Sequence, residues 1–407
     1  MKNLGGALAL LLLAASASFA GLPDAGWSSL SIAIPVPALP ALPPPRLLVP
    51  PLIAPPPVPA VVFKGLSIKA VQFSRTDRIP VSLVAAIDKT EKTLLLSLYD
   101  LRLSEVADAL LRAKDRGVKI RLIYDYGHVK GGEPAGSAAS PEYLALLKAG
   151  VPIRLLKGGG SFGIMHNKFA VFDGALLMTG SFNWTRAADD RHFENAVFKT
   201  DPELIAGFIK YWNWMWPLSS PPKAEQPPGA EFGPPPADPL KPVAFGGGFY
   251  PRYAFSPQGG VEDLLVDALG RARKTIDVAI FSLYSQRVAD ALIAAKGRGV
   301  KVRVVSDASQ SRRSQAVLSI AVSGAGLRLS SGREAMGVMH HKYVLVDGAL
   351  LMSGSYNFSQ NAELYNFEND LFTTETAEVG AYRAEFSFIW QQAHVPSPEE
   401  LPAPKQL

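Results

Sequence analysis

Residues 165–185 read MHNKFAVFDGALLMTGSFNWT, and residues 339–359 read MHHKYVLVDGALLMSGSYNFS. Both stretches place a His two residues before a Lys and an Asp five residues beyond that Lys. A Gly-Ser pair and, two residues after the Ser, an Asn complete each stretch. Matches at so many fixed spacings rarely arise by chance, and a second copy in the same chain makes chance untenable. This window therefore marks an internal duplication.

The duplication extends beyond the window. Thr93–Asp125 aligns without gaps on Thr275–Asp307, whereas His166 and His340 lie closer together along the chain than the offset of that alignment requires. The second copy is thus eight residues shorter between Asp307 and His340, and we expect the difference to lie in a surface loop. The chain is predicted to be two repeats of one folding unit.

Each repeat alternates short apolar runs of strand length with amphipathic runs of helical period. Asp-Gly after the Lys-containing run predicts a tight turn between two strands. This order predicts an α/β fold in which helices cover a mixed sheet in each half. The predicted strands are Leu94–Leu98, Val118–Tyr124, Ile153–Leu156, Phe169–Phe172, Ala175–Met178, Ile276–Phe281, Val300–Val305, Tyr343–Val346 and Ala349–Met352, and the predicted helices are Ser104–Arg116, Pro141–Lys148, Glu203–Trp214, Gln286–Arg298 and Ala377–Trp390.

The flanking segments differ in composition from the repeats. Lys2, an apolar run and Ser18-Phe19-Ala20 have the form of a secretory signal peptide, with an uncleaved anchor as the alternative. Proline-rich stretches predict an extended tether and a linker. The predicted organisation is a signal peptide at 1–20, a tether at 21–60, the first repeat at 61–216, a linker at 217–246, the second repeat at 247–395 and a tail at 396–407.

Composition sets further bounds. The chain of 407 residues carries a formal charge of +5, which favours anionic partners, although a solvated surface explains most of this small excess. It contains no Cys, which excludes disulfides, thiolate metal sites and a Cys nucleophile. The signal peptide predicts an exported protein, periplasmic or secreted.

The side chains of the duplicated window suit a phosphoryl group. Lys, Asn and Ser offer hydrogen-bond donors to its oxygens, and we expect this role for Lys168, Ser181, Asn183, Lys342, Ser355 and Asn357. A neutral imidazole attacks phosphorus, and a protonated one gives a proton to a leaving oxygen. With His166 and His340 facing each other, one would form a phosphohistidine while the other serves as acid and base.

Two carboxylates recur beside these residues. Glu194 and Glu368 each follow the His of their own motif at the same spacing and are candidates for orienting an imidazole. Asp173 and Asp347 complete the candidate catalytic set, but each lies at a strand–turn corner, where a structural role is at least as well supported.

The remaining His residues and a metal site are weaker candidates. By strand alternation, His341 is expected to point away from the site, and His128, His192 and His394 have no duplicated counterpart. Zinc binding by His166 and His340 is the rival chemistry, but a Lys close to each would repel a dication. We therefore expect no metal and no cofactor.

The doubled window resembles the signature of the phospholipase D superfamily, and the resemblance covers both repeats. It implies two tandem α/β/α sandwich repeats related by a pseudo-two-fold axis, with a metal-independent phosphodiesterase site at their interface. By this resemblance His166 is the nucleophile and His340 the general acid and base. The two windows are equivalent, so their residues alone do not decide between the two roles.

The superfamily includes phospholipid hydrolases, phosphatidyl transferases and nucleases, so the fold does not choose a substrate. The leading hypothesis is an exported phospholipid hydrolase or head-group transferase that contacts a membrane surface peripherally and has no obligate protein partner. The alternatives are an exported nuclease acting on DNA or RNA, and a binding protein without catalysis.

Overall fold

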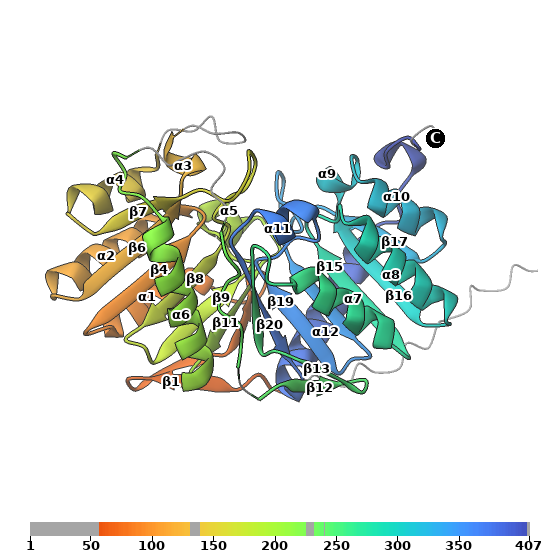
Figure 1. The fold of residues 1–407 in the computed structure, drawn as a ribbon, viewed down its shortest axis with the longest axis horizontal. Helices are drawn as coiled ribbons and strands as arrows, with labels where there is room; N and C mark the ends of the chain where they lie inside the picture. Colours follow the sequence, from red (N-terminus) through yellow and green to blue (C-terminus); the bar gives the residue numbers. More distant parts are fainter. Residues whose placement is uncertain (1–56, 131–138, 225–231, 240, 405–407) are drawn as a thin grey trace, which may run out of the picture. The chain divides into compact units, whose positions relative to one another are not determined.

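A computed structural model describes residues 57–130, 139–224, 232–239 and 241–404 (Figure 1). The predicted signal peptide and most of the predicted tether lie outside the described residues. Residues from Ala54 onward form one compact unit that contains both repeats. Within the described residues, no helix is both long and apolar enough to cross a membrane.

Each half contains a seven-stranded mixed sheet with the same strand order, which confirms the predicted duplication and fold class. One strand of each sheet, β4 (Thr93–Leu98) or β15 (Thr275–Ile280), pairs in parallel with its neighbour on one side and antiparallel with its neighbour on the other. The first sheet runs β3 (Val71–Phe73), β11 (Asn195–Lys199), β9 (Leu176–Gly180), β8 (Lys168–Phe172), β4 (Thr93–Leu98), β6 (Lys119–Asp125), β7 (Ile153–Leu156). The second runs β14 (Tyr253–Ser256), β20 (Glu368–Thr373), β19 (Leu350–Gly354), β18 (Lys342–Val346), β15 (Thr275–Ile280), β16 (Lys301–Asp307), β17 (Gly326–Ser330).

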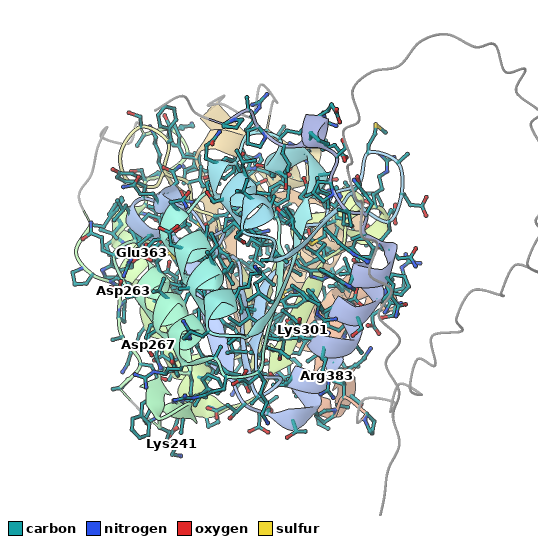
Figure 2. The ribbon with its side chains drawn as sticks, turned by 90° about the vertical axis from the view of Figure 1, so that its right-hand side faces the viewer. Lys241, Asp263, Asp267, Lys301, Glu363 and Arg383 are labelled. Atoms are coloured by element: carbon teal, nitrogen blue, oxygen red, sulfur yellow. The ribbon has the colours of Figure 1, made fainter. Side chains whose placement is uncertain are left out.

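Helices cover the outer face of each sheet because their apolar residues recur at helical spacing. In α7, Val261 and Leu265 are buried, whereas Asp263 and Asp267 are exposed on the surface seen in Figure 2. The outer helices are α1 (Ile79–Lys89), α2 (Ser104–Asp115) and α4 (Pro141–Lys148) in the first half, and α7 (Val261–Arg271), α8 (Gln286–Gly297) and α10 (Gln315–Val322) in the second.

Two long helices, α6 (Pro202–Leu218) and α12 (Thr376–Gln392), contribute to the core that joins the halves. In α6, Phe208 packs against Phe169 of the first sheet and Phe255 of the second, at centroid distances of 5.2 and 5.1 Å. The shorter elements are β1 (Ala60–Phe63), β2 (Leu66–Lys69), β5 (Leu101–Arg102), α3 (Gly127–Lys130), β10 (Trp184–Thr185), α5 (Arg186–Asp190), β12 (Val243–Phe245), β13 (Gly248–Tyr250), α9 (Ala308–Ser311), α11 (Gln360–Leu364) and a 3-10 turn at Pro398–Glu400.

Two predicted connections can be compared with the structure. The tight turn after β8 is confirmed, because Asp173 and Gly174 have positive φ angles of 51° and 65°. The linker prediction was incomplete, because Phe232 within it is buried and packs on Phe367 at a centroid distance of 4.8 Å. Part of the linker therefore belongs to the folded body.

Candidate active site

The two halves meet through short backbone pairings at the start of each motif. The His166 amide donates to the Phe367 carbonyl at 2.9 Å, and the His340 amide donates to the Phe193 carbonyl at 3.0 Å. Each motif His is thereby held beside the residue that precedes a glutamate of the opposite half. We call this pairing crossed, because each motif His contacts the other half of the chain.

The side chains follow the same crossing. His166 Nδ1 lies 2.8 and 2.9 Å from the two carboxylate oxygens of Glu368, and His340 Nδ1 lies 2.8 Å from Glu194 Oε1. Each glutamate thus faces the imidazole of the other half, and not the His that it follows in sequence. All four side chains are buried. The second pair is close but is not aligned as a hydrogen bond.

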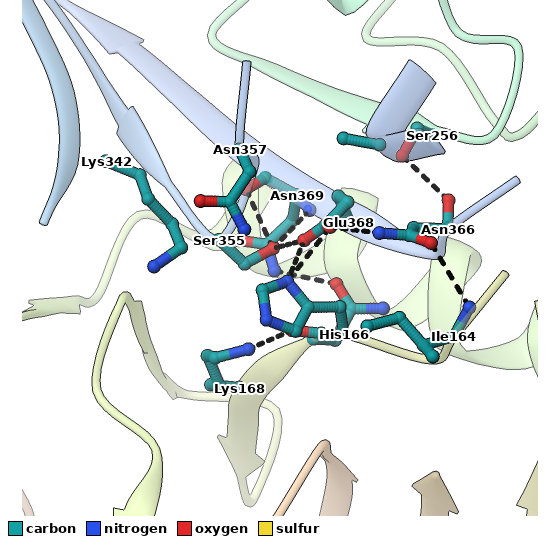
Figure 3. A network of polar contacts seen from close by, with 12 residues as sticks. Ile164, His166, Lys168, Ser256, Lys342, Ser355, Asn357, Asn366, Glu368 and Asn369 are labelled. Carbon is teal, nitrogen blue, oxygen red and sulfur yellow. Dashed lines mark hydrogen bonds and ion pairs between the residues drawn. The ribbon is translucent and has the colours of Figure 1, made fainter. Parts of the chain in front are cut away.

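The two glutamates differ in how they are anchored, and Figure 3 shows the contacts of Glu368. Glu368 also accepts hydrogen bonds from the Ser355 hydroxyl at 2.6 Å and from the Asn366 side-chain amide at 3.0 Å. Glu194 accepts one from the Ser181 hydroxyl at 2.6 Å. At the position equivalent to Asn366, the first half has a His whose Nδ1 accepts from a backbone amide.

The two carboxyls also differ in proton affinity. Burial raises the pKa of Glu194 to about 8, against the opposing effect of Lys342 and its hydrogen bonds. Burial also acts on Glu368, but His166, Lys168 and the Ser355 hydroxyl hold its pKa below the usual value. Glu368 is therefore ionised at neutral pH, while Glu194 retains a proton.

Burial keeps both imidazoles neutral. It lowers the pKa of His166 to about 4, with Lys168 acting in the same direction and Glu368 opposing. The pKa of His340 is lowered well below its usual value by burial and by Lys342 and Lys168. A neutral His166 that donates Nδ1–H to Glu368 leaves the lone pair of Nε2 free for nucleophilic attack.

Both motif lysines lie in the same buried cluster. Lys168 Nζ donates to the His166 carbonyl, and Lys342 Nζ donates to the His340 carbonyl at 2.7 Å. Burial lowers the pKa of Lys168 to about 7 and that of Lys342 to about 8. Figure 3 places both ammonium groups and the amide of Asn357 together beside the His166 ring. An anion entering here would favour their charged forms.

The predicted phosphate-binding serines have another contact in the structure. The Ser181 and Ser355 hydroxyls each donate to a glutamate, so neither has its proton available for a phosphoryl oxygen in this arrangement. We correct their direct role to one of orienting the carboxylates. Asn183 and Asn357 are half-buried, and their predicted role in phosphate binding stays a prediction.

Asp173 and Asp347 lie at the far ends of β8 and β18 from the two lysines. Asp173 accepts from the backbone amides of Glu91, Lys92 and Thr93 at 2.7–2.9 Å and pairs with Lys64. Asp347 accepts from the amides of residues 273–275 in the same way. A strand of five residues separates each from the imidazoles, on the order of 15 Å. We therefore correct the predicted catalytic role to a structural one.

His341 points away from the catalytic cluster, as strand alternation predicts. Its Nδ1 accepts from the Asn195 side-chain amide at 2.9 Å, and the ring packs edge-on to Phe73. Burial lowers its pKa. In the first half, Asn167 takes the equivalent position and accepts from Asn369 at 2.7 Å. Both contacts add to the interface behind the catalytic pairs.

Sequence reasoning missed several supporting residues. Asp125 and Asp307 accept hydrogen bonds from the backbone amides of Met165 and Met339, both at 3.0 Å, and so fix the chain just before each motif His. The two aspartates stand at matching places in the gap-free alignment of the repeats, and that recurrence was the available signal. Asn366 gave no such signal, because its counterpart is a different residue.

Zinc binding was the rival chemistry for the two motif imidazoles. Among the described residues, no group of three or more His, Cys, Asp or Glu side chains is arranged to hold a metal ion. The nitrogen donors of the cluster lie beside two lysines. The prediction that no cofactor is required stays a prediction.

Comparison with known proteins gives consistent similarities. A family model described as "Cardiolipin synthase, PLD-like domain" matches residues 83–216 and 265–390. A mitochondrial cardiolipin hydrolase from Chlamydomonas reinhardtii is 31% identical over 144 residues, which are 34% of this chain and 59% of that protein. A phospholipase D from Rickettsia conorii is 32% identical over 126 residues, 31% of this chain and 58% of that protein. The matches thus span less than two thirds of either relative.

A solved structure reproduces the fold over both halves. Phosphatidylserine synthase from Haemophilus influenzae Rd KW20 aligns with a TM-score of 0.63 over 83% of this chain and 89% of that chain, at 13% sequence identity. At such low identity the likeness concerns the fold alone.

Proposed function

Because this chain belongs to the phospholipase D superfamily, we propose that it is a metal-independent phosphodiesterase that cleaves phospholipid head groups through a phosphohistidine. The observation that carries the proposal is the crossed pairing of His166 with Glu368 and of His340 with Glu194. This pairing brings two buried imidazoles from different halves into one cluster with two lysines.

In the first step, the lone pair of His166 Nε2 attacks phosphorus. The bond from phosphorus to the leaving alcohol breaks, and its electron pair stays on the alcohol oxygen. That oxygen takes a proton from the His340–Glu194 pair. The product is a phosphohistidine on His166 and a free alcohol.

In the second step, water replaces the alcohol. The His340–Glu194 pair takes a proton from water while the water oxygen bonds to phosphorus. The phosphorus–nitrogen bond breaks, and its electron pair returns to His166 Nε2, which restores the starting state. An acceptor alcohol in place of water would give head-group transfer by the same path.

The anchoring of the glutamates supports this assignment of roles. Ionised Glu368 orients His166 and stabilises the cation that forms on it, which suits a nucleophile. Glu194 retains a proton up to about pH 8, so the His340 side holds the proton that a leaving alkoxide needs. The ammonium groups of Lys168 and Lys342 would stabilise the charge on the phosphoryl oxygens.

The closing test is activity without metal. Purified protein in EDTA would be assayed on phosphatidylcholine, cardiolipin, single-stranded DNA and RNA, beside His166→Ala. We expect lipid hydrolysis that persists in EDTA and falls by about a thousandfold or more in the variant. His394→Ala, on the exposed surface, is the matched control and should leave the rate unchanged.

Two outcomes would contradict the proposal. Loss of all activity in EDTA would point to metal chemistry. Turnover of DNA or RNA without lipid hydrolysis would make nuclease activity, the alternative for the same kind of bond, the function of this site.

A further inference from the structure

A different aromatic residue lies beside each catalytic imidazole. We call the surface formed by Tyr99 beside His166 the first wall, and the one formed by Phe281 beside His340 the second wall. Tyr99 follows β4 and packs edge-on to His166, with ring centroids 4.8 Å apart. The equivalent residue of the second half is Phe281, whose ring lies 4.7 Å from that of His340. A phenol hydroxyl is therefore present on the first wall and absent from the second. Tyr99 is half-buried.

A second polar ring continues the first wall. The His128 ring lies 4.4 Å from Tyr99, and both of its nitrogens are buried without a hydrogen-bond partner among the described residues. Buried polar atoms normally have hydrogen-bond partners, so we expect a ligand to supply a partner for a ring nitrogen of His128. At the equivalent position, Gln310 has its side-chain oxygen bonded by the Ser282 hydroxyl at 3.1 Å. Only the first wall shows such unused nitrogens within the described residues.

The surrounding charges restrict what this wall can bind. Lys168 Nζ lies 4.8 Å from the centre of the Tyr99 ring. Burial, then Arg102 and Lys168, lower the pKa of His128, while Asp100 opposes them. Asp100 is itself paired with Arg102 at 3.0 Å. The imidazole is therefore neutral, and the neighbouring cations disfavour an ammonium group here. A hydrogen-bond acceptor that carries no positive charge fits this wall.

The in-line reaction decides which part of the substrate reaches this wall. If His166 attacks, the leaving alcohol departs on the side of His340. The first wall, on the His166 side, is then available to contact the alcohol that stays bonded to phosphorus. In a phospholipid that alcohol is diacylglycerol, whose nearest uncharged acceptors are its ester carbonyl oxygens.

We propose that the Tyr99 hydroxyl and the His128 imidazole form a subsite that donates hydrogen bonds to the ester carbonyls of the retained diacylglycerol. This inference rests on the proposed function and adds the class of lipid that the site accepts. The subsite discriminates ester-linked from ether-linked lipids, because ether lipids lack those carbonyls and would leave the donors unpaired.

The test compares two linkages with the same head group. Diacyl and dialkyl forms of phosphatidylglycerol and phosphatidylcholine, matched in chain length and in detergent micelles, would be given to the full chain, Tyr99→Phe, His128→Phe and the control His394→Phe. We expect the wild type and the control to prefer the diacyl form by about tenfold in kcat/KM. Each subsite variant should reduce this preference about three- to tenfold by slowing the diacyl lipid alone.

The outcomes separate the two claims. Hydrolysis of both linkages at equal rates by the wild type, or an equal slowing of both by the variants, would overturn the subsite while the proposed function stands. No hydrolysis of any of the four lipids would overturn the subsite, and failure on cardiolipin as well would overturn the proposed function. Unchanged thermal unfolding of the variants would confirm that the ratio reports on recognition.

Discussion

The two catalytic His–Glu pairs come from the same duplicated window, yet their surroundings differ, and one difference lies directly beside the glutamates. The Asn366 side-chain amide donates a hydrogen bond to Glu368. The equivalent His192 accepts a hydrogen bond from a backbone amide, and among the described residues it makes no hydrogen bond to Glu194. One carboxyl is ionised and the other keeps its proton. His166, Lys168 and the Ser355 hydroxyl keep Glu368 ionised, whereas burial prevails at Glu194, whose contact with His340 is not aligned as a hydrogen bond. The comparison teaches that equivalent residues of a duplicated window can differ in protonation and so take the attacking and the proton-donating role.

The largest effect is expected from His340→Ala. Removing the acid should lower lipid turnover about a thousandfold or more, because an alkoxide is a poor leaving group without a proton. A p-nitrophenyl phosphodiester needs no such proton, so the variant should release one burst of p-nitrophenolate and stop as phosphohistidine. Mass spectrometry should find the phosphoryl group on His166.

The reciprocal variant checks the direction of the comparison. His166→Ala should give neither a burst nor a phosphorylated peptide. A trapped phosphoryl group on His340 in that variant would reverse the two roles.

The two glutamates should respond differently to amide substitution. Glu368→Gln should slow both lipid and p-nitrophenyl substrates about a hundredfold, because the nucleophile loses its orienting anion. Glu194→Gln should slow the lipid about a hundredfold but the p-nitrophenolate burst less than tenfold, because only the lipid needs the proton. Stopped-flow bursts measure this difference. Equal effects of the two variants on the burst would remove the distinction between the pairs.

The pH profile reports the same difference. Wild-type kcat/KM should rise with pH through about 4 as His166 loses its proton. It should fall above about 7 to 8, as Lys168 and Lys342 lose their protons and Glu194 ionises. His192→Asn copies the second half and should give Glu194 an amide donor. Its ionised form would be stabilised, which should move the alkaline limb down by about one pH unit. An unmoved limb would mean that this position does not set the pKa of Glu194.

The smallest effect on activity is expected from a substitution of Asp173, at the end of β8. Asp173→Asn should lower the free energy of unfolding by about 1–3 kcal/mol and change kcat less than twofold, because it weakens bonds to three backbone amides. Although burial opposes it, Lys64 and those amides hold the pKa of Asp173 below its usual value. Its stabilisation is therefore present above the unfolded pKa and lost as pH falls through the folded one.

Thermal unfolding across pH measures this contribution, with exposed Asp263→Asn as the control. A large loss of activity in Asp173→Asn without a loss of stability would restore the catalytic role that the sequence window suggested.

Much of the fold could be predicted from the sequence because its signals are local. The predicted helix Pro141–Lys148 and strand Ile153–Leu156 agree with the structure residue for residue, and the other predicted elements differ from it at their ends. The short edge strand β3 was missed because three residues carry too little periodicity. Phe232 was taken as linker because proline-rich sequence does not reveal where an aromatic side chain packs.

For the site, the motif correctly predicted that the imidazoles and lysines lie together, but not which carboxylate faces each imidazole. Spacing along the chain places Glu194 nearer to His166, and only the pairing of the halves across the interface reveals that it faces His340. The hydroxyls of Ser181 and Ser355 suited phosphate by chemical type, but a buried carboxylate takes up each one. Contacts between halves decide these assignments, and no periodicity records them.

The exchange of glutamates between halves has a consequence for how activity depends on dilution. An isolated half would contain an imidazole without its orienting carboxylate, so two separate fragments would need to collide before either could work. A covalent connection of a few tens of residues keeps the partners at an effective concentration of about millimolar. Activity per molecule should therefore be the same in very dilute samples as in concentrated ones, whereas a chain cut at the linker would lose activity on dilution.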